Sequence, residues 1–233
     1  MIAEHSTAAN TRERIVVAAC RLLAEGGREA VSTRAVSAAA GVQAPTIYRL
    51  FGDKRGLLDA VAAHGLSTYL NGKADRTPSA DPVADLRRGW DRHVGFGLAN
   101  PALFALIYGE PRPGESPPAA VVASDHLART IRRIAEAGRL RVGEERAAHL
   151  IQGACCGTTL MLIALPEERR DATLSDMTRE ALLTAITTDV PAPATPGPVG
   201  AAVALRALLP RTAVLTPNEG ALLHEWLDRI AGG

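Results

Sequence analysis

The sequence is poor in aromatic residues and in cysteine. Phe, Trp and Tyr make up 3% of the 233 residues, so a core has to be built mainly from Leu, Val, Ile and Ala. The three cysteines, Cys20, Cys155 and Cys156, are an odd number with two adjacent, which gives neither a disulfide framework nor metal-ligand spacing. We expect buried helix cysteines and no metal site, with a redox-sensing Cys155–Cys156 pair as the alternative interpretation.

Long apolar runs are also missing. The most apolar stretch, residues 150–165, is shorter than the roughly 20 residues of a membrane span, and it contains Gln152, Thr158 and Thr159. The N-terminus has no basic start followed by a continuous apolar run, so no secretory signal is predicted. We therefore expect a soluble, cytoplasmic protein with no membrane partner.

The motifs of common enzyme classes do not occur. G-x-S-x-G, Gly-rich phosphate loops and H-E-x-x-H are missing, and the six histidines include no pair at helical spacing. No alternating strand pattern occurs either. The sequence predicts an all-α protein that is not an enzyme, with no catalytic residue and no cofactor.

Two short helices joined by a glycine turn, and the start of a third, are predicted over residues 31–54. Ser32 can cap the first helix, and Gly41 can take the left-handed conformation that ends it. Pro45 suits the first turn of the second helix, where its missing N–H would have no partner. Asp53 can then cap a longer helix.

The second of these helices has an inner and an outer face. Ile47, Leu50 and Phe51 share one side, which leaves polar side chains outside: Gln43, Thr46, Tyr48 and Arg49. This is the geometry that places a helix in the DNA major groove. A plain helical hairpin with a solvated face has the same pattern.

Charge is distributed unevenly along the chain. The net charge is only +1, but residues 12–55 hold eight basic and four acidic residues, a net +4 that leaves −3 for the rest. We call residues 12–55 the head and the rest of the chain the body. A basic head is suited to contact DNA, and a mildly acidic body does not compete with it for DNA.

The helical pair carries Ala40-Gly41-Val42, Thr46-Ile47-Tyr48 followed by Phe51, and then Lys54 and Leu57. With these motifs, residues 11–58 resemble the DNA-binding domain of the TetR family of bacterial transcriptional regulators. Beyond residue 58 the resemblance is one of architecture. The family implies a helical body that dimerises and holds a small molecule.

The resemblance assigns phosphate contacts to Thr33, Tyr48 and Lys54. Relatives often carry Ser or Thr in place of Gln43, so we expect Gln43 to read a base rather than cap the helix. Arg49 can pair with guanine, and small apolar groups can touch a thymine methyl. The candidate DNA-binding residues are Thr33, Arg34, Gln43, Ala44, Pro45, Thr46, Tyr48, Arg49 and Lys54.

The body is predicted from repeated cap-plus-proline signals, which open helices at Pro82, Pro101 and Pro117. Asn100 is the expected cap of the second of these. Thr216 and Glu219 form a capping box before a last helix. The expected domains are a flexible arm (1–10), the helix-turn-helix domain (11–58), the ligand-binding and dimerisation domain (59–188), a Pro-rich linker (189–200) and an extra C-terminal helical pair (201–233), which we expect to pad the body.

Two further sites follow from the family's architecture. A small-residue strip on the helix 144–165 leads to a predicted dimer interface at Gly153, Gly157, Leu160 and Leu182. The strip also fits close packing within one chain. Aromatic and polar residues at inward positions are candidate ligand contacts: Trp90, His93, Phe96, Phe104, Tyr108, His126, Gln152 and Cys156.

The sequence as a whole predicts a ligand-responsive transcriptional repressor. Its expected partners are a near-palindromic double-stranded DNA operator, a second copy of the chain and an unidentified small, mostly apolar effector. Two alternatives stay open: an architectural DNA-binding protein without ligand control, and an all-α enzyme.

Overall fold

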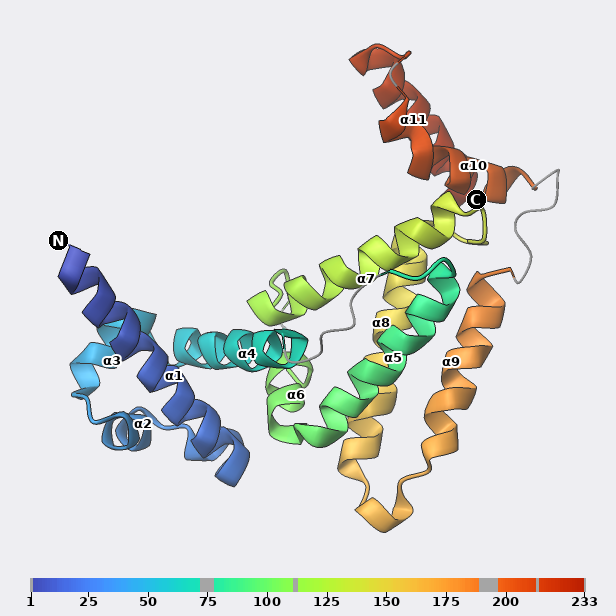
Figure 1. Cartoon of the computed structure of the whole chain (residues 1–233). Coiled ribbons are helices and arrows are strands. Elements are labelled where there is room, and N and C mark those ends of the chain that lie inside the picture. The colour runs from blue at the N-terminus through green and yellow to red at the C-terminus, as the bar shows by residue number, and fades with distance from the viewer. Residues whose placement is uncertain (1, 72–77, 111–112, 189–196, 213, 233) are drawn as a thin grey trace. The chain divides into compact units, whose positions relative to one another are not determined.

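The structure, a computed structural model, describes residues 2–71, 78–110, 113–188, 197–212 and 214–232. Within these ranges every regular element is helical, and the sole β contact is an isolated bridge between Leu140 and Thr187. The predicted all-α class is therefore confirmed (Figure 1).

The helices follow one another in the order drawn in Figure 1. The first seven are α1 (Ile2–Ala30), α2 (Thr33–Ala40), α3 (Ala44–Phe51), α4 (Lys54–Asn71), α5 (Pro82–Ala99), α6 (Pro101–Tyr108) and α7 (Pro118–Glu136). The rest are α8 (Glu144–Ala164), a short 3-10 turn (Glu167–Arg169), α9 (Ala172–Ile186), α10 (Pro198–Leu208), a second 3-10 turn (Leu209–Arg211) and α11 (Pro217–Gly232).

Contacts divide the chain into two compact units that interleave in sequence. The first comprises residues 1–76 and 96–122, and the second residues 77–95 and 123–233. The first unit holds α1 to α4 together with α6, because α6 packs on both α1 and α4. This division differs from the boundary expected near residue 58.

The core of the first unit is mainly aliphatic, as the scarcity of aromatics requires, with Phe96 and Phe104 as buried aromatic residues. Its deeply buried aliphatic residues come from α1 to α4 and the turns between them: Ile15, Ala19, Leu23, Val31, Val36, Ile47, Leu57 and Val61. Val36 and Ala40 fill the inner face of α2, and Ala39 between them in sequence is exposed. These contacts hold α2 and α3 on a rigid base.

The N-terminal region differs from the frayed arm expected over residues 1–10. Helix α1 begins at Ile2, since no Gly or Pro occurs before Gly26 and Ala is the best helix former. At the other end, Gly26 and Gly27 leave helical geometry, with Gly27 at φ +66°. The two glycines therefore place a kink inside α1.

The second unit contains a pair of antiparallel helices, α8 and α9, that lie side by side (Figure 1). Asp171 caps α9 by accepting a hydrogen bond from the backbone N–H of Thr173 at 2.9 Å. Trp90 of α5 donates its indole N–H to Ser175 of α9 at 2.9 Å. The hydrogen bond between Trp90 and Ser175 joins α5 to α9.

The two C-terminal helices, α10 and α11, pack on each other. The capping box is confirmed: Glu219 accepts from the Thr216 backbone N–H at 2.8 Å, and Thr216 Oγ1 accepts from the Glu219 N–H at 3.4 Å. Arg206 of α10 binds Glu144 of α8 at 2.9 Å, which ties the pair to the start of α8. Helix α10 starts at Pro198, inside the range expected as linker; residues 189–196 lie outside the described residues.

One predicted cap is wrong. Asn100 precedes α6, but its side chain makes no capping bond there. Instead its amide donates to the carbonyl of Phe96 at 3.1 Å, and so satisfies the end of α5. The single residue between α5 and α6 serves the preceding helix, while Pro101 starts the next one without a side-chain cap.

Candidate nucleic-acid interface

The turn between α2 and α3 has the geometry that the sequence indicated. Ser32 accepts a hydrogen bond from the Ala35 backbone N–H at 3.1 Å and caps α2. Gly41 ends α2 at φ +62°, a conformation that side chains with a Cβ rarely adopt. Its N–H and that of Val42 donate to carbonyls of the last turn. The two helices are therefore joined with their backbone groups satisfied.

Helix α3 separates sharply into buried and exposed sides. Ile47 is 1% exposed and anchors the helix, whereas Tyr48 on the other side is 52% exposed. Gln43, Pro45 and Arg49 are also exposed. Ala44 and Thr46 are half-buried. A helix that is held by a buried residue and is polar on its outer side can enter the DNA major groove while the rest of the domain keeps its fold.

Gln43 occupies the N-cap position of α3 without acting as a side-chain cap. Its backbone carbonyl accepts from the Thr46 N–H at 2.9 Å, while its amide makes no capping bond. The side chain therefore remains able to present its carbonyl and NH₂ to a base edge, where glutamine pairs with adenine.

The first turns of α2 and α4 supply the remaining predicted contacts. Asp53 accepts from the Gly56 N–H at 2.7 Å and so caps α4. Lys54 follows it and is exposed. At the start of α2, Arg34 is exposed and Thr33 half-buried. Helix N-termini and cations favour a phosphate oxygen, so these positions suit an anionic backbone.

Two arginines of α1 have roles in the first unit that the sequence did not indicate. Arg14 donates to the carbonyl of Ala40 at 2.7 Å, at the end of α2. Arg12 lies over the Phe51 ring at 5.1 Å, which is a cation–π contact. Both join residues that are far apart in the chain, so no local pattern could have revealed them. They brace α2 and α3 against α1.

The candidate ligand residues fall into separate groups. In the first unit, the ring of Phe104 packs at a tilt against those of Phe96 and Tyr108, with ring centroids 6.3 and 4.8 Å apart. Phe96 also contacts the ring of Tyr69 at 4.5 Å. The three predicted aromatic residues of this unit therefore form one cluster, to which the sequence analysis had not assigned Tyr69.

The second unit brings polar candidates together between α5, α7 and α8. His93 Nε2 lies 3.7 Å from Cys156 Sγ, and Ser124 donates to the side-chain carbonyl of Gln152 at 3.1 Å. Burial lowers the pKa of His93 to about 4 and raises the pKa of Cys156 to about 12, so both groups are uncharged near neutral pH. His126 is exposed, with its Nδ1 3.3 Å from Arg129, and lies outside this group.

The outer faces of α8 and α9 are apolar and largely uncovered. Gly153 and Gly157 are exposed, and within the described chain a Cβ at either would meet no atom within 4 Å. Met177 of α9 is 70% exposed. Leu160 and Leu182 are half-buried. Within the part of the chain that the structure describes, no atom lies within 4 Å of a Cβ placed at either glycine of the small-residue strip.

Helix α8 is the one described helix whose length and apolar composition would allow it to cross a membrane. The same test is passed by core helices of soluble proteins. Only 28% of its apolar window is buried by the rest of the chain. Such a surface is typical of a helix that another protein subunit covers.

Among the described residues, no group of three or more His, Cys, Asp or Glu side chains could hold a metal ion. All three cysteines are free thiols. Burial raises the pKa of Cys20, Cys155 and Cys156, which keeps each thiol protonated.

Residues 15–61 match the family model of the bacterial regulatory proteins, tetR family. No curated protein matches the chain. Solved structures with the same fold include a TetR-family transcriptional regulator from Haemophilus influenzae RD (20% identity, TM-score 0.53, covering 77% of this chain and 98% of that one). A transcriptional regulator of the TetR family from Agrobacterium tumefaciens is 22% identical, with a TM-score of 0.53 over 78% of this chain and all of its own.

A third structure, described as a possible TetR family transcriptional regulator from Streptomyces coelicolor A3(2), matches nearly the full length. It is 24% identical, with a TM-score of 0.52, and covers 95% of this chain and 97% of its own. The first two structures match only part of this chain, whereas this third structure matches nearly all of it.

Proposed function

We propose that the chain is a ligand-responsive, DNA-binding repressor of the tetR family of bacterial regulatory proteins, whose family model matches residues 15–61. It binds a near-palindromic operator as a homodimer and is released by a small molecule. The observation that carries the proposal is the anchored α3, with Ile47 buried and Tyr48, Arg49 and Gln43 exposed beside the basic starts of α2 and α4.

DNA recognition divides into positioning and reading. Tyr48, Lys54 and Thr33 hold phosphates and so fix the register of α3. Gln43 and Arg49 read base edges, and Ala44 and the Thr46 methyl contact thymine methyls. The exposure of Gln43 without a capping bond supports its role as a reader.

The homodimer is proposed to form through α8 and α9, whose outer faces would build a four-helix bundle with a second copy. Three observations support this: the open space at Gly153 and Gly157, the exposure of Met177, and the small buried share of α8. In the dimer, Leu160 and Leu182 become more deeply buried. Two heads related by a two-fold axis then read two half-sites.

The effector is proposed to be small, mostly apolar and uncharged, and to contact the interior groups of the body. His93, Gln152 and Cys156 supply hydrogen-bonding atoms without net charge, beside Trp90. The Phe96, Phe104 and Tyr108 cluster is a separate candidate for apolar ligand contacts, within the first unit alone. An uncharged site disfavours a ligand that carries an unpaired charge.

Release would run through α4 and α6. A Cβ at Gly65 of α4 would lie 2.5 Å from Leu103 of α6, so the glycine lets the two helices approach closely. A ligand that displaces α6 therefore displaces α4, which carries Lys54. Because a ligand shifts an equilibrium only by its differential affinity, the effector must bind the released form better than the DNA-bound form.

Selection of bound duplexes from a randomised library, at two salt concentrations, tests the function. An enriched near-palindrome is the expected result. Weak, steeply salt-dependent binding without a motif would contradict it and favour an architectural DNA-binding protein.

Substitutions then test the assigned roles on the selected site. Tyr48→Phe and Lys54→Ala should weaken binding to specific and random duplexes alike, because both are phosphate contacts. Gln43→Ala should relax discrimination at one base position in each half-site. A Lys54→Ala variant that changes only the preferred sequence would remove Lys54 from the phosphate contacts.

A further inference from the structure

The connection between α6 and α7 carries two glutamates that contact the DNA-binding end of the first unit. Glu110 binds a guanidinium nitrogen of Arg28 at the end of α1, and Glu115 binds one of Arg55 in the first turn of α4. The partners are 82 and 60 residues apart in sequence. All four residues belong to the first unit.

These residues line an open cleft of about 770 Å³ at the start of α4. Its lining holds three cations and three carboxylates together with two apolar residues: Arg28, Lys54, Arg55, Glu29, Glu110, Glu115, Leu58 and Pro113. Lys54 is the lysine assigned above to a DNA phosphate. The carboxylates of the connection therefore share a cleft with a DNA-contacting cation.

Carboxylates in this position compete with phosphate for the same cations. An arginine paired to a glutamate has to release or share that partner before it can bind a phosphate oxygen. At physiological salt, charges interact over about 8 Å, so carboxylates lining the same cleft also weaken the attraction of Lys54 for DNA.

The pairs are suited to displacement rather than to a permanent lock. The side chains of Arg28 and Glu110 are 43% and 61% exposed, and those of Arg55 and Glu115 are 52% and 63% exposed. Exposed pairs of this kind contribute little to stability. A DNA backbone with many phosphates can therefore replace them, at a reduced net affinity.

We propose that Glu110 and Glu115 are intramolecular substitutes for DNA phosphate that lower the affinity of the protein for its operator. This inference rests on the proposed function and adds a way to regulate it. Glu110 lies two residues after the end of α6, so a shift of α6 changes where its carboxylate sits. The same helix that is proposed to respond to the effector thus controls how strongly the competing carboxylate holds Arg28.

The competing interpretation is that the two pairs only fasten the connection to the head. The amide variants E110Q and E115Q distinguish the two interpretations, since glutamine keeps the size and a hydrogen-bonding oxygen of glutamate but removes its charge. Fastening alone predicts unchanged or weaker DNA binding. Competition predicts tighter binding.

The experiment uses the full chain and a fluorescent duplex carrying the selected operator, with anisotropy measured over a range of KCl concentrations. We expect the double variant E110Q/E115Q to bind roughly three- to tenfold tighter at moderate salt. Its slope of log affinity against log salt should steepen by about one to two, because each additional phosphate contact contributes about 0.9. Random duplex should gain similarly.

A matched control is E225Q in α11, which removes an exposed glutamate paired with Arg229 and makes the same change in net charge as either single variant, E110Q or E115Q, but in the second unit. Its binding should stay within about twofold of the wild type, since its charge lies outside the cleft. In addition, R55Q placed in the E115Q background should abolish the gain that E115Q produces.

The outcomes separate this inference from the function on which it rests. Specific wild-type binding that neither glutamate variant tightens, or a gain equal to that of E225Q, overturns the inference alone. A folded wild-type chain that binds no duplex overturns the proposed function, and the inference with it.

Discussion

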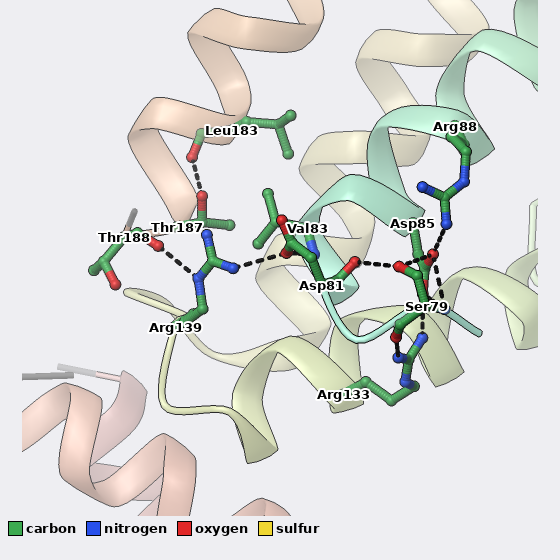
Figure 2. Close-up of polar contacts among 10 residues, drawn as sticks. All are labelled: Ser79, Asp81, Val83, Asp85, Arg88, Arg133, Arg139, Leu183, Thr187 and Thr188. Atoms are coloured by element: carbon green, nitrogen blue, oxygen red, sulfur yellow. Dashed lines mark hydrogen bonds and ion pairs between the residues drawn. The ribbon is translucent and has the colours of Figure 1, made fainter. Parts of the chain in front are cut away.

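Arg133 of α7 holds Asp85 of α5 and the backbone before it at the same time. One guanidinium nitrogen lies 2.5 Å from Asp85 Oδ2, and another donates to the Ser79 carbonyl at 2.6 Å. Ser79 Oγ also donates to Asp85 at 2.8 Å (Figure 2). The Asp85 side chain is only 12% exposed, so it depends on these partners.

Removing this arginine should therefore destabilise the second unit. We expect Arg133→Ala to lower the free energy of unfolding by about 1–3 kcal/mol, because the largely buried Asp85 carboxylate then keeps only the exposed Arg88 as a cationic partner among the described residues. Arg132→Ala is the control: Arg132 is 56% exposed and lies 3.5 Å from Glu144, and such pairs contribute about 0–1 kcal/mol. Equal losses in urea unfolding would contradict the assignment.

His93 should make the second unit sensitive to acid. Burial lowers its pKa from 6.5 to about 4, so the folded chain favours the neutral ring. This stabilisation is complete above pH 6.5 and is lost as pH falls towards 4, by a few kcal/mol at most, since one pKa unit is about 1.4 kcal/mol. His93→Gln should flatten the decline in unfolding free energy between these two values.

The control for that measurement is His224→Gln, because His224 is 54% exposed on α11. Its curve of unfolding free energy against pH should follow the wild type. A His93→Gln curve that retains the full wild-type slope would show that another group titrates in this window.

Gly56 in the first turn of α4 cannot be replaced without moving backbone. A Cβ there would lie 2.1 Å from the carbonyl oxygen of Phe51 at the end of α3. Gly56→Ala should cost about 1–3 kcal/mol by overpacking and weaken DNA binding by displacing α3. Gly89→Ala, in open space in α5, should instead stabilise the chain by about 0.5–1 kcal/mol. Equal melting temperatures would contradict both expectations.

The proposed dimer face can be tested at a position that is empty in the single chain. A Cβ at Gly157 would meet no atom of the described chain within 4 Å, so we expect the Gly157→Leu monomer to fold normally. In the dimer the added side chain meets the partner helix, and we expect the dissociation constant to rise at least about tenfold, given overpacking costs of 1–3 kcal/mol. Sedimentation velocity measures this, with Gly95→Leu as an equally open control in α5.

The cysteine thiols should react slowly in the folded protein. Burial raises the pKa of Cys20, Cys155 and Cys156, so little thiolate is present at pH 8. We expect maleimide to label all three slowly before denaturation and rapidly after it. Fast labelling of the native chain at any one thiol would revive the redox interpretation of the Cys155–Cys156 pair.

Local features of the fold were predictable because their causes are local. The Ser32 cap, the left-handed Gly41 and the Thr216–Glu219 box each involve groups within three residues of one another. The inner side of α3 followed from the helical spacing of Ile47, Leu50 and Phe51 in the same way, which left Tyr48 on the exposed side.

Contacts between distant residues were not predictable from the sequence. Arg14 reaches the carbonyl of Ala40 across 26 positions, and Glu110 reaches Arg28 across 82. Their spacing carries no periodic signal, because the turns and packing that unite them are set by the whole fold. The assignment of α6 to the same unit as α1 and α4 was missed for this reason.

The two tryptophans of the chain stand at opposite extremes of exposure. Trp90 is 2% exposed and hydrogen-bonded to Ser175, whereas Trp226 on α11 is 50% exposed, between Leu222 and Ile230 on the outer side of that helix. The fluorescence emission maxima of the two tryptophans should differ in wavelength, and a soluble quencher should reach only Trp226. The protein thus carries an unlabelled optical probe of its interior and another of its C-terminal helix, which can be read independently in one cuvette.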